Sequence, residues 1–277
     1  MRRLRAFLTA LVLAVFLLMW VFPVIWGGVT SLKTEKYVLA YPPISPFHPT
    51  LRSYADVLGG SVSILPNLLS SAILTIAATS ITILLAVPAA YSLARLQLPL
   101  RRPVGFYILA TQMLPPIGLV IPYFLIFTSI GLLDSYTGLT TVYICFSLPF
   151  AIWLLVSYFE DIPREMEEAA YIDRASRLKA LWYVILPQAR GGIAVTIVFV
   201  ALNVWNEFLF AVVLGGRHVR PVTVAMFNFI SLEQTQWARL SAGALVAMAP
   251  VILLGMAAQK HIVKGLTLGA VKGTARR

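Results

Sequence analysis

Charged residues are scarce in this sequence. Only 12% of its 277 residues are Asp, Glu, Lys or Arg, whereas 59% are hydrophobic. A soluble domain carries roughly a quarter charged residues, so this chain lacks the polar side chains to cover a water-facing surface of that size. The composition indicates a chain that uses lipid as its main solvent.

Cysteine and histidine are also scarce. The single Cys145 cannot close an intramolecular disulfide, and its apolar surroundings predict an ordinary buried side chain. His48, His218 and His261 are scattered, and no Cys/His cluster has the spacing of a metal site. We predict no metal ion in this chain.

A phosphate-binding loop is missing as well. The pattern Gly-x-x-x-x-Gly-Lys-(Ser/Thr) occurs nowhere, so the chain is not expected to hydrolyse ATP or to hold a cofactor of its own. The net charge of +11 could indicate a nucleic-acid partner. The basic residues stand in short runs between apolar segments, however, which is the pattern of membrane orientation, and we expect no nucleic acid.

Six stretches approach the roughly 20 apolar residues that a membrane helix needs. They are residues 7–29, 68–94, 105–127, 136–158, 193–214 and 241–258. The first stretch could be a secretory signal, but its apolar run is too long and no clear small-x-small cleavage site ends it. The sequence predicts an all-α polytopic membrane protein with one domain, residues 1–277.

The distribution of Lys and Arg predicts the orientation. Sixteen of these residues lie in the N-terminus, the loops after the second and fourth spans, and the C-terminal tail, against six in the other connections. By the positive-inside rule, both termini lie in the cytoplasm, and six spans agree with that. We expect a multi-pass protein of the cytoplasmic (inner) membrane.

Proline lies within or beside several spans. Membrane helices tolerate proline, but each one removes a backbone hydrogen bond and can kink its helix around a translocation path. The pair Pro115–Pro116, which follows Gln112, is expected to be the strongest break.

The loop of residues 160–192 is a polar segment between two apolar spans. Pro163 is followed by acidic residues, a combination that favours the start of a helix, here expected to run to Asp173. A second short helix is expected to start at Ser176 as N-cap and to end at Pro187. The loop could lie on the lipid surface, but an acidic helix suits a groove in a protein better than an anionic membrane.

This loop resembles the signature of ABC importer permeases, which is Glu-Ala-Ala, three residues, Gly, nine residues and Ile-x-Leu-Pro. Here Glu168-Ala169-Ala170 and Val184-Ile185-Leu186-Pro187 agree with it in spacing over 20 positions. Arg174 stands where the family has the glycine of a turn, so it must either avoid a positive φ or accept strain.

Two other segments are similar to the maltose-type carbohydrate importers. They are the tail from Gly265 to Gly273 and the Trp205-Asn206-Glu207-Phe208 segment. The resemblance implies the type I importer permease fold, with a cytoplasmic coupling helix that docks on an ATPase. It also implies the inner permease subunit of a sugar importer, which forms half of the translocation path.

The resemblance further implies the partners. They are two copies of an ATP-binding subunit that holds ATP and Mg²⁺, a second homologous permease, an extracytoplasmic solute-binding protein and a sugar. ATPase contact is implied for the loop residues Glu165, Glu168, Ala169, Ala170, Asp173, Arg174, Leu186 and Pro187, and for Lys272 and Gly273 of the tail.

Candidates for the substrate path lie in the spans. A carboxylate in hydrocarbon is costly, so Glu207 is expected to face a cavity or to pair with another group. Asn203 precedes it by four residues and could share its helix face, Asn206 is a polar neighbour, and Trp205 could stack on a sugar ring. Gln112 and Tyr143 are weaker candidates.

Two other classes of function compete with this one. A secondary, ion-coupled transporter could use Glu207 as a proton or sodium site, but it leaves the spacing of the loop unexplained. A membrane transferase would need paired carboxylates or a metal cluster at a membrane face, and the sequence offers neither.

Overall fold

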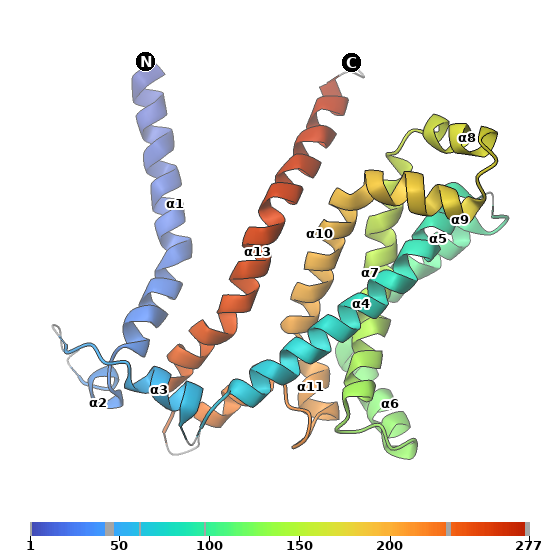
Figure 1. The fold of residues 1–277 in the computed structure, drawn as a ribbon. Helices are drawn as coiled ribbons and strands as arrows, with labels where there is room; N and C mark the ends of the chain where they lie inside the picture. Colours follow the sequence, from blue (N-terminus) through green and yellow to red (C-terminus); the bar gives the residue numbers. More distant parts are fainter. Residues whose placement is uncertain (1, 42–46, 61, 97, 231–233, 275–277) are drawn as a thin grey trace. The chain divides into compact units, whose positions relative to one another are not determined.

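The computed structural model describes residues 2–41, 47–60, 62–96, 98–230 and 234–274, and within these ranges it contains helices and no strand. The all-α prediction is therefore confirmed (Figure 1). In chain order the helices are α1 (Arg2–Ser31), α2 (Glu35–Val38), α3 (Arg52–Gly59), α4 (Leu65–Arg95), α5 (Arg101–Thr111), α6 (Pro116–Ser129), α7 (Tyr136–Glu160), α8 (Arg164–Ile172), α9 (Arg177–Ala180), α10 (Leu186–Trp205), α11 (Leu209–Leu214), α12 (Val222–Ala225) and α13 (Trp237–Thr274).

Five helices are long and apolar enough to cross a membrane, and one bent pair brings the number up to six. The five are Ala6–Ser31, Leu65–Arg95, Tyr136–Glu160, Arg177–Trp205 and Trp237–Met256. The third expected span is instead two helices, α5 and α6, which meet at an angle of 89°. Residues 112–115 separate them, so the predicted break at Pro115–Pro116 is confirmed.

The fifth span differs from the prediction at both ends. The helix begins at Arg177, inside the loop, and ends at Trp205 instead of continuing to 214. Composition could not give these limits, because the segment after the break is as apolar as the one before it. That segment forms the separate short helix α11.

The described chain gathers into two compact units. Unit 1 contains Met1–Leu68 and Ala225–Ala249, and unit 2 contains Leu69–Val224 and Pro250–Arg277. That residues 1–277 act as one permease domain stays a prediction.

In unit 1, polar contacts fix the start of α13. The Glu35 carboxylate accepts hydrogen bonds from the backbone N–H groups of Ala238 (2.9 Å) and Arg239 (3.4 Å), at the positive end of the helix dipole. The Arg239 guanidinium forms an ion pair with Asp56 at 2.7 Å. A hollow of about 290 Å³ borders Glu35, Asp56 and Arg239. The apolar side chains of α1 are mostly exposed, as suits a helix surrounded by lipid.

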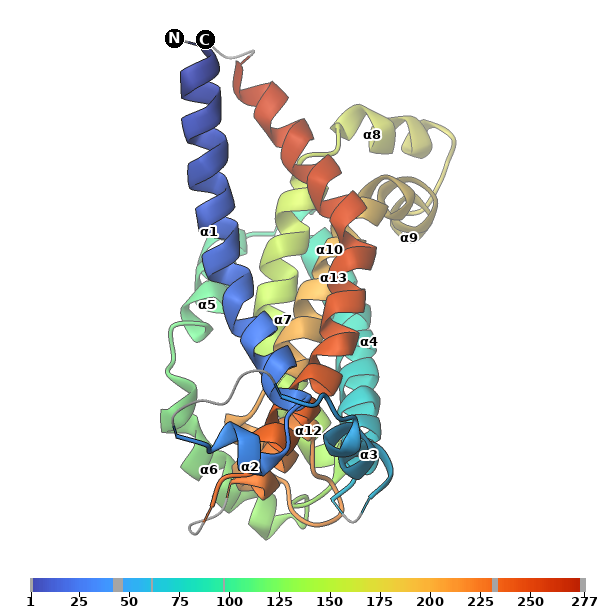
Figure 2. The same cartoon turned by 90° about the vertical axis from the view of Figure 1, so that its left-hand side faces the viewer.

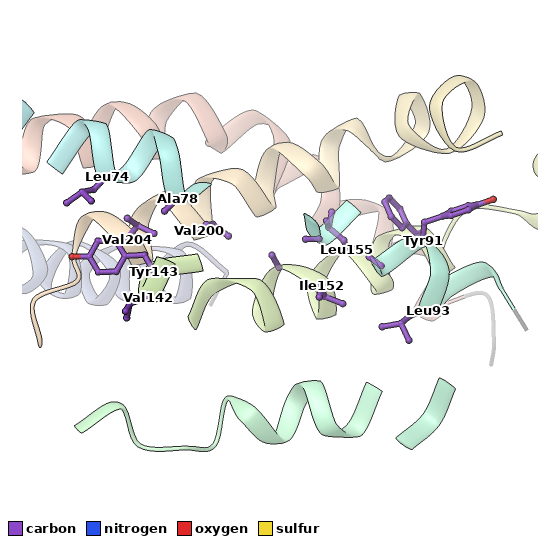
Figure 3. Packing of buried hydrophobic residues seen from close by; sticks show 14 of the residues in the cluster. Leu74, Ala78, Tyr91, Leu93, Val142, Tyr143, Ile152, Leu155, Val200 and Val204 are labelled. Carbon is purple, nitrogen blue, oxygen red and sulfur yellow. The ribbon is translucent and has the colours of Figure 1, made fainter. Parts of the chain in front are cut away.

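In unit 2, α4, α7 and α10 enclose the apolar core. Leu74 and Ala78 of α4, Val142 and Leu155 of α7, and Val200 of α10 belong to one cluster of buried side chains, part of which Figure 3 shows. Alanines at one side of α4 are fully buried, which lets neighbouring backbones approach closely. Helices α8 and α9 lie beyond one end of α7 and α10 in both views, and α6 and α11 lie at the other (Figures 1 and 2).

Asp134 connects the turn before α7 to the loop after α11. Its carboxylate accepts hydrogen bonds from the backbone N–H groups of Arg217, His218 and Val219 at 2.8–3.1 Å. Its φ of 50° is left-handed, a conformation that Asp tolerates better than most residues. A Cβ at Gly216 would come within 2.5 Å of this carboxyl group, so only glycine fits there.

Replacing Asp134 by Asn should cost about 1 kcal/mol of stability near neutral pH, a figure reduced for solvent screening. Partial burial alone would raise the pKa of Asp134, but the hydrogen bonds from Val219, His218 and Arg217 outweigh it and lower that pKa below its usual value. A carboxyl group whose pKa is lowered by folding stabilises the fold above its unfolded pKa of about 4 and loses that contribution as pH falls further. Thermal unfolding of both proteins at pH 7 and pH 3 checks this. The difference in unfolding temperature between the two proteins should be smaller at pH 3 than at pH 7. An equal difference at both pH values would refute the assignment.

Candidate functional site

Helix α8 begins as the sequence predicts. Pro163 has an extended backbone and occupies the N-cap, and Glu165 and Glu167 lie in the first turn, where the helix dipole favours negative charge. The helix ends at Ile172 with Asp173 as C-cap. The 160–192 loop thus contains the expected first helix, and this helix lies outside the apolar core of unit 2.

Arg174 adopts the left-handed conformation of the glycine that it replaces, with φ of 58°. Its N–H bonds to the Tyr171 carbonyl at 3.0 Å, and the Ala175 N–H bonds to the Ala170 carbonyl at 2.9 Å. These two bonds form a Schellman motif, whose usual residue at this position is glycine because it has no Cβ. The turn geometry of the signature is therefore kept, and the arginine accepts the strain.

Replacing Arg174 by Gly should stabilise the loop slightly. It removes a left-handed penalty of about 1–2 kcal/mol, against about 0.5–1 kcal/mol of added chain entropy in the unfolded state. A net gain of about 0.5 kcal/mol should appear as slower hydrogen exchange at the end of α8. Arg174→Ala keeps the Cβ and serves as the control. If both changes slow hydrogen exchange equally, Arg174 is not strained by its left-handed conformation.

The second helix of the loop does not end at Pro187, so that prediction was wrong. Ser176 caps it as expected, accepting a hydrogen bond from the Lys179 N–H at 3.4 Å. The chain then makes a π turn over Leu181–Ile185, in which the Leu186 N–H bonds to the Leu181 carbonyl. Pro187 consequently falls in the first turn of α10, directly after this π turn, and does not end the helix. Loop and span are thus one continuous helical segment.

Glu167 is the residue of α8 that the sequence did not single out, although it is buried. Its Oε1 accepts hydrogen bonds from the hydroxyl groups of Tyr91, in α4, and of Tyr171 at 2.5 Å. Its Oε2 lies 3.6 Å from Nε of Arg95, at the end of α4. Burial and the bond to Glu167 raise the pKa of Tyr171, so its hydroxyl stays a donor. The one sequence signal is that Glu167 and Tyr171 are four residues apart and share a helix face.

The rest of the surface of α8 is mostly open. Glu165, Glu168, Ala169 and Asp173 are exposed, and Ala170 is half-buried. Large apolar side chains of the same loop are exposed beside these charges. They include Ile172 (82%), Tyr183 (79%), Leu178 and Trp182. A loop that exposes acidic, small and large apolar side chains together indicates a docking segment for a protein.

A hollow of about 570 Å³ lies beside α8. It is lined by Arg95, Leu96, Leu98, Arg164, Glu167, Glu168, Tyr171 and Arg177. Three arginines and two glutamates make its wall polar.

The last two predicted contact residues lie farther along the same loop. Leu186 is half-buried and Pro187 is exposed.

Glu207 has a structural role that the sequence did not predict. It lies beyond the end of α10, so the expected helical pairing with Asn203 does not exist. Its two carboxylate oxygens accept hydrogen bonds from the N–H groups of Phe210 (2.8 Å) and Ala211 (3.1 Å), the first turn of α11. This contact starts α11 and marks the point where the fifth span breaks.

The other substrate-path candidates lie in different surroundings. Trp205 is 6% exposed, so its ring has no open face for a sugar in this structure. Asn206 donates to the Leu202 carbonyl at 2.8 Å and Gln112 to the Phe146 carbonyl at 3.1 Å, whereas Tyr143 is buried. Asn203 is exposed. Of these candidates, the structure brings Tyr143 of α7 next to the Glu207 carboxylate.

The tail residues Lys272 and Gly273 fall in the last turns of α13. Their expected contact with an ATPase stays a prediction.

The chain matches a known family over most of its length. Residues 82–268 match the family model described as binding-protein-dependent transport system inner membrane component. The chain is 36% identical over 263 residues to the sulfoquinovosyl glycerol transport system permease protein SmoH of Agrobacterium fabrum, covering 94% of this chain and 92% of that protein. It is 31% identical over 277 residues to the trehalose/maltose transport system permease protein MalG of Thermococcus litoralis, covering 99% and 98%.

A solved structure agrees with these matches. It is a crystal structure of a bacterial ABC transporter involved in the import of the acidic polysaccharide alginate, with a TM-score of 0.79 and 26% identity, covering 93% of this chain and 96% of that chain. The fold is thus that of a type I ABC importer permease. The chain belongs to the family of binding-protein-dependent transport system inner membrane components, the permeases of ABC importers, in the group that includes sugar transport permeases.

Proposed function

We propose that this chain is a membrane-spanning subunit of an ATP-driven sugar importer. It forms half of the translocation path and docks on a separate ATPase through the 160–192 loop. The observation that carries the proposal is α8, a helix outside the apolar core with an exposed acidic and small-residue face and a buried face attached to α4. A surface helix of this kind suits insertion into a cleft of a partner protein.

The energy for transport comes from the partners. The chain has no phosphate-binding loop, so ATP and Mg²⁺ are held by two copies of an ATP-binding subunit. A second homologous permease completes the path, and an extracytoplasmic solute-binding protein delivers the sugar. Closure of the ATPase pair moves α8, and the packed spans alternate between inward-open and outward-open arrangements.

The excess of Lys and Arg in both termini and in the 160–192 loop supports a cytoplasmic position for all three. The names of relatives that transport trehalose, maltose and sulfoquinovosyl glycerol support a carbohydrate or a glycoside as substrate. The ion-coupled alternative has no support, because the Glu207 carboxylate is engaged by backbone donors at the start of α11.

Transport in reconstituted vesicles tests the proposal. The chain is purified with a candidate ATPase, second permease and solute-binding protein from the same organism, and labelled mono- and disaccharides are offered with the binding protein. Uptake should require ATP on the ATPase side and should stop when the ATPase carries an inactivating substitution. Uptake driven by an ion gradient without ATP hydrolysis would overturn the proposal.

A further inference from the structure

A group of four polar side chains joins three elements of unit 2 at the end of the bundle where α8 lies. Tyr91 and Arg95 come from α4, and Glu167 and Tyr171 come from α8. The side chains of Arg95 and Glu167 are only 4% and 7% exposed. We call these four residues the Glu167 cluster. Figure 3 shows Tyr91 at the edge of the apolar core, with its hydroxyl directed away from the other labelled residues.

Arg95 brings the third element into the cluster. One of its terminal nitrogens, Nη2, donates to the carbonyls of Phe159 (2.5 Å) and Ile162 (2.6 Å), at the end of α7. Carbonyls at a helix C-terminus have no partner within the helix and attract a cation. A single guanidinium group therefore holds the end of α7 while it faces the carboxylate of α8.

The hydrogen bonds that Glu167 accepts from Tyr91 and Tyr171 are directional. Charge-assisted hydrogen bonds in a buried site fix distances and angles, whereas apolar contacts allow two surfaces to slide. The segments at the two ends of α8 are short turns, around residues 161–163 and 173–176. A force on α8 would bend these turns if nothing else attached the helix to the spans.

We propose that Glu167 is a positioning residue of the transport cycle, which fastens α8 to the ends of α4 and α7. A displacement of α8 by the docked ATPase then moves both spans with it, as one body. The proposal rests on the proposed function and deepens it, because it separates transmission through Glu167 from docking through the exposed face.

The test compares Glu167→Gln with Glu160→Gln in the full reconstituted complex. Both changes replace a carboxylate by an amide of the same size, but Glu160 is exposed at the end of α7, outside α8, and pairs with Arg101 at the surface. Glu167→Gln keeps an acceptor oxygen for the two tyrosines and removes the negative charge that faces Arg95. Three quantities are measured: co-purification with the ATPase, ATP hydrolysis, and sugar imported per ATP hydrolysed.

Glu167→Gln should assemble and hydrolyse ATP, with sugar imported per ATP reduced about fivefold, whereas Glu160→Gln should behave as wild type. Hydrogen exchange of the α8 amides should be faster by a similar factor in Glu167→Gln alone. The gentler change Tyr91→Phe should give a smaller loss, and the double variant should lose less than the product of the two, because both residues act through one contact.

An unchanged ratio of sugar to ATP in Glu167→Gln overturns the proposal. If that variant fails to assemble, the ratio of sugar to ATP is measured in Tyr91→Phe instead, and an unchanged ratio there overturns the proposal. Failure of the proposed function looks different. In that case the wild-type complex itself shows no ATP-dependent uptake, and both proposals are wrong.

Discussion

Replacing Gly192 by alanine should cost this chain about 2 kcal/mol of stability, within the range expected for an overpacked core. Gly192 is buried on α10, and a Cβ there would run into the ring of Tyr158 on α7, at its Cγ and Cδ atoms. These are the ring atoms nearest the backbone of Tyr158, so turning the ring about its own axis does not remove the clash and the helices must shift. Helices α7 and α10 would have to separate along their contact.

The neighbouring Gly191 supplies a matched control. A Cβ at this position meets nothing within 4 Å. Gly191→Ala should therefore be neutral or should stabilise α10 by up to about 1 kcal/mol, because alanine favours the helix. Thermal unfolding of the two purified variants in the same detergent measures the difference, and a fall of similar size in both would contradict the close packing at Gly192.

Hydropathy predicted the existence of the spans well. The expected limits 7–29, 68–94 and 136–158 fall inside the helices Ala6–Ser31, Leu65–Arg95 and Tyr136–Glu160. Lipid selects for the summed apolarity of a whole segment, so this feature is visible without any tertiary contact. The helix break at Pro115 was equally visible, because proline acts on its own backbone.

The fifth span was harder to predict because its limits depend on hydrogen bonds. Pro187 indicated a helix end, but a π turn one residue longer than an α-turn puts it at the start of α10. Glu207 indicated a site in the membrane, but it caps α11. In both cases the residue was noticed correctly, and its role depended on which backbone group it meets in the folded chain.

The 160–192 loop shows the same limit of prediction from sequence. The signature identified α8 and its exposed residues, yet Glu167 and Glu168 look alike in the sequence. Only the fold separates them, since one faces Arg95 and the other faces solvent. Arg95 itself indicated nothing beyond membrane orientation, because its contacts come from residues 64–72 positions away.

Reversing the charge of Glu168 should abolish docking on the ATPase while the chain stays folded. Glu168 is exposed on α8, so Glu168→Lys changes the surface offered to a partner and leaves the Glu167 cluster intact. Against a groove that accepts an acidic helix, the new charge meets unpaired like charges, which costs several kcal/mol of binding. Pull-down with a tagged ATPase and thermal unfolding of the free chain measure the two effects separately.

Two comparisons make this result specific. Glu160→Lys makes the same change at an exposed position outside α8 and should keep the ATPase. Glu167→Lys places a second cation beside Arg95 and leaves a buried charge unpaired, which should cost about 3–5 kcal/mol of folding stability. Unchanged co-purification of Glu168→Lys would refute its role in docking. Loss of docking there, with docking kept and import uncoupled in Glu167→Gln, would show that two adjacent glutamates divide attachment and transmission between them.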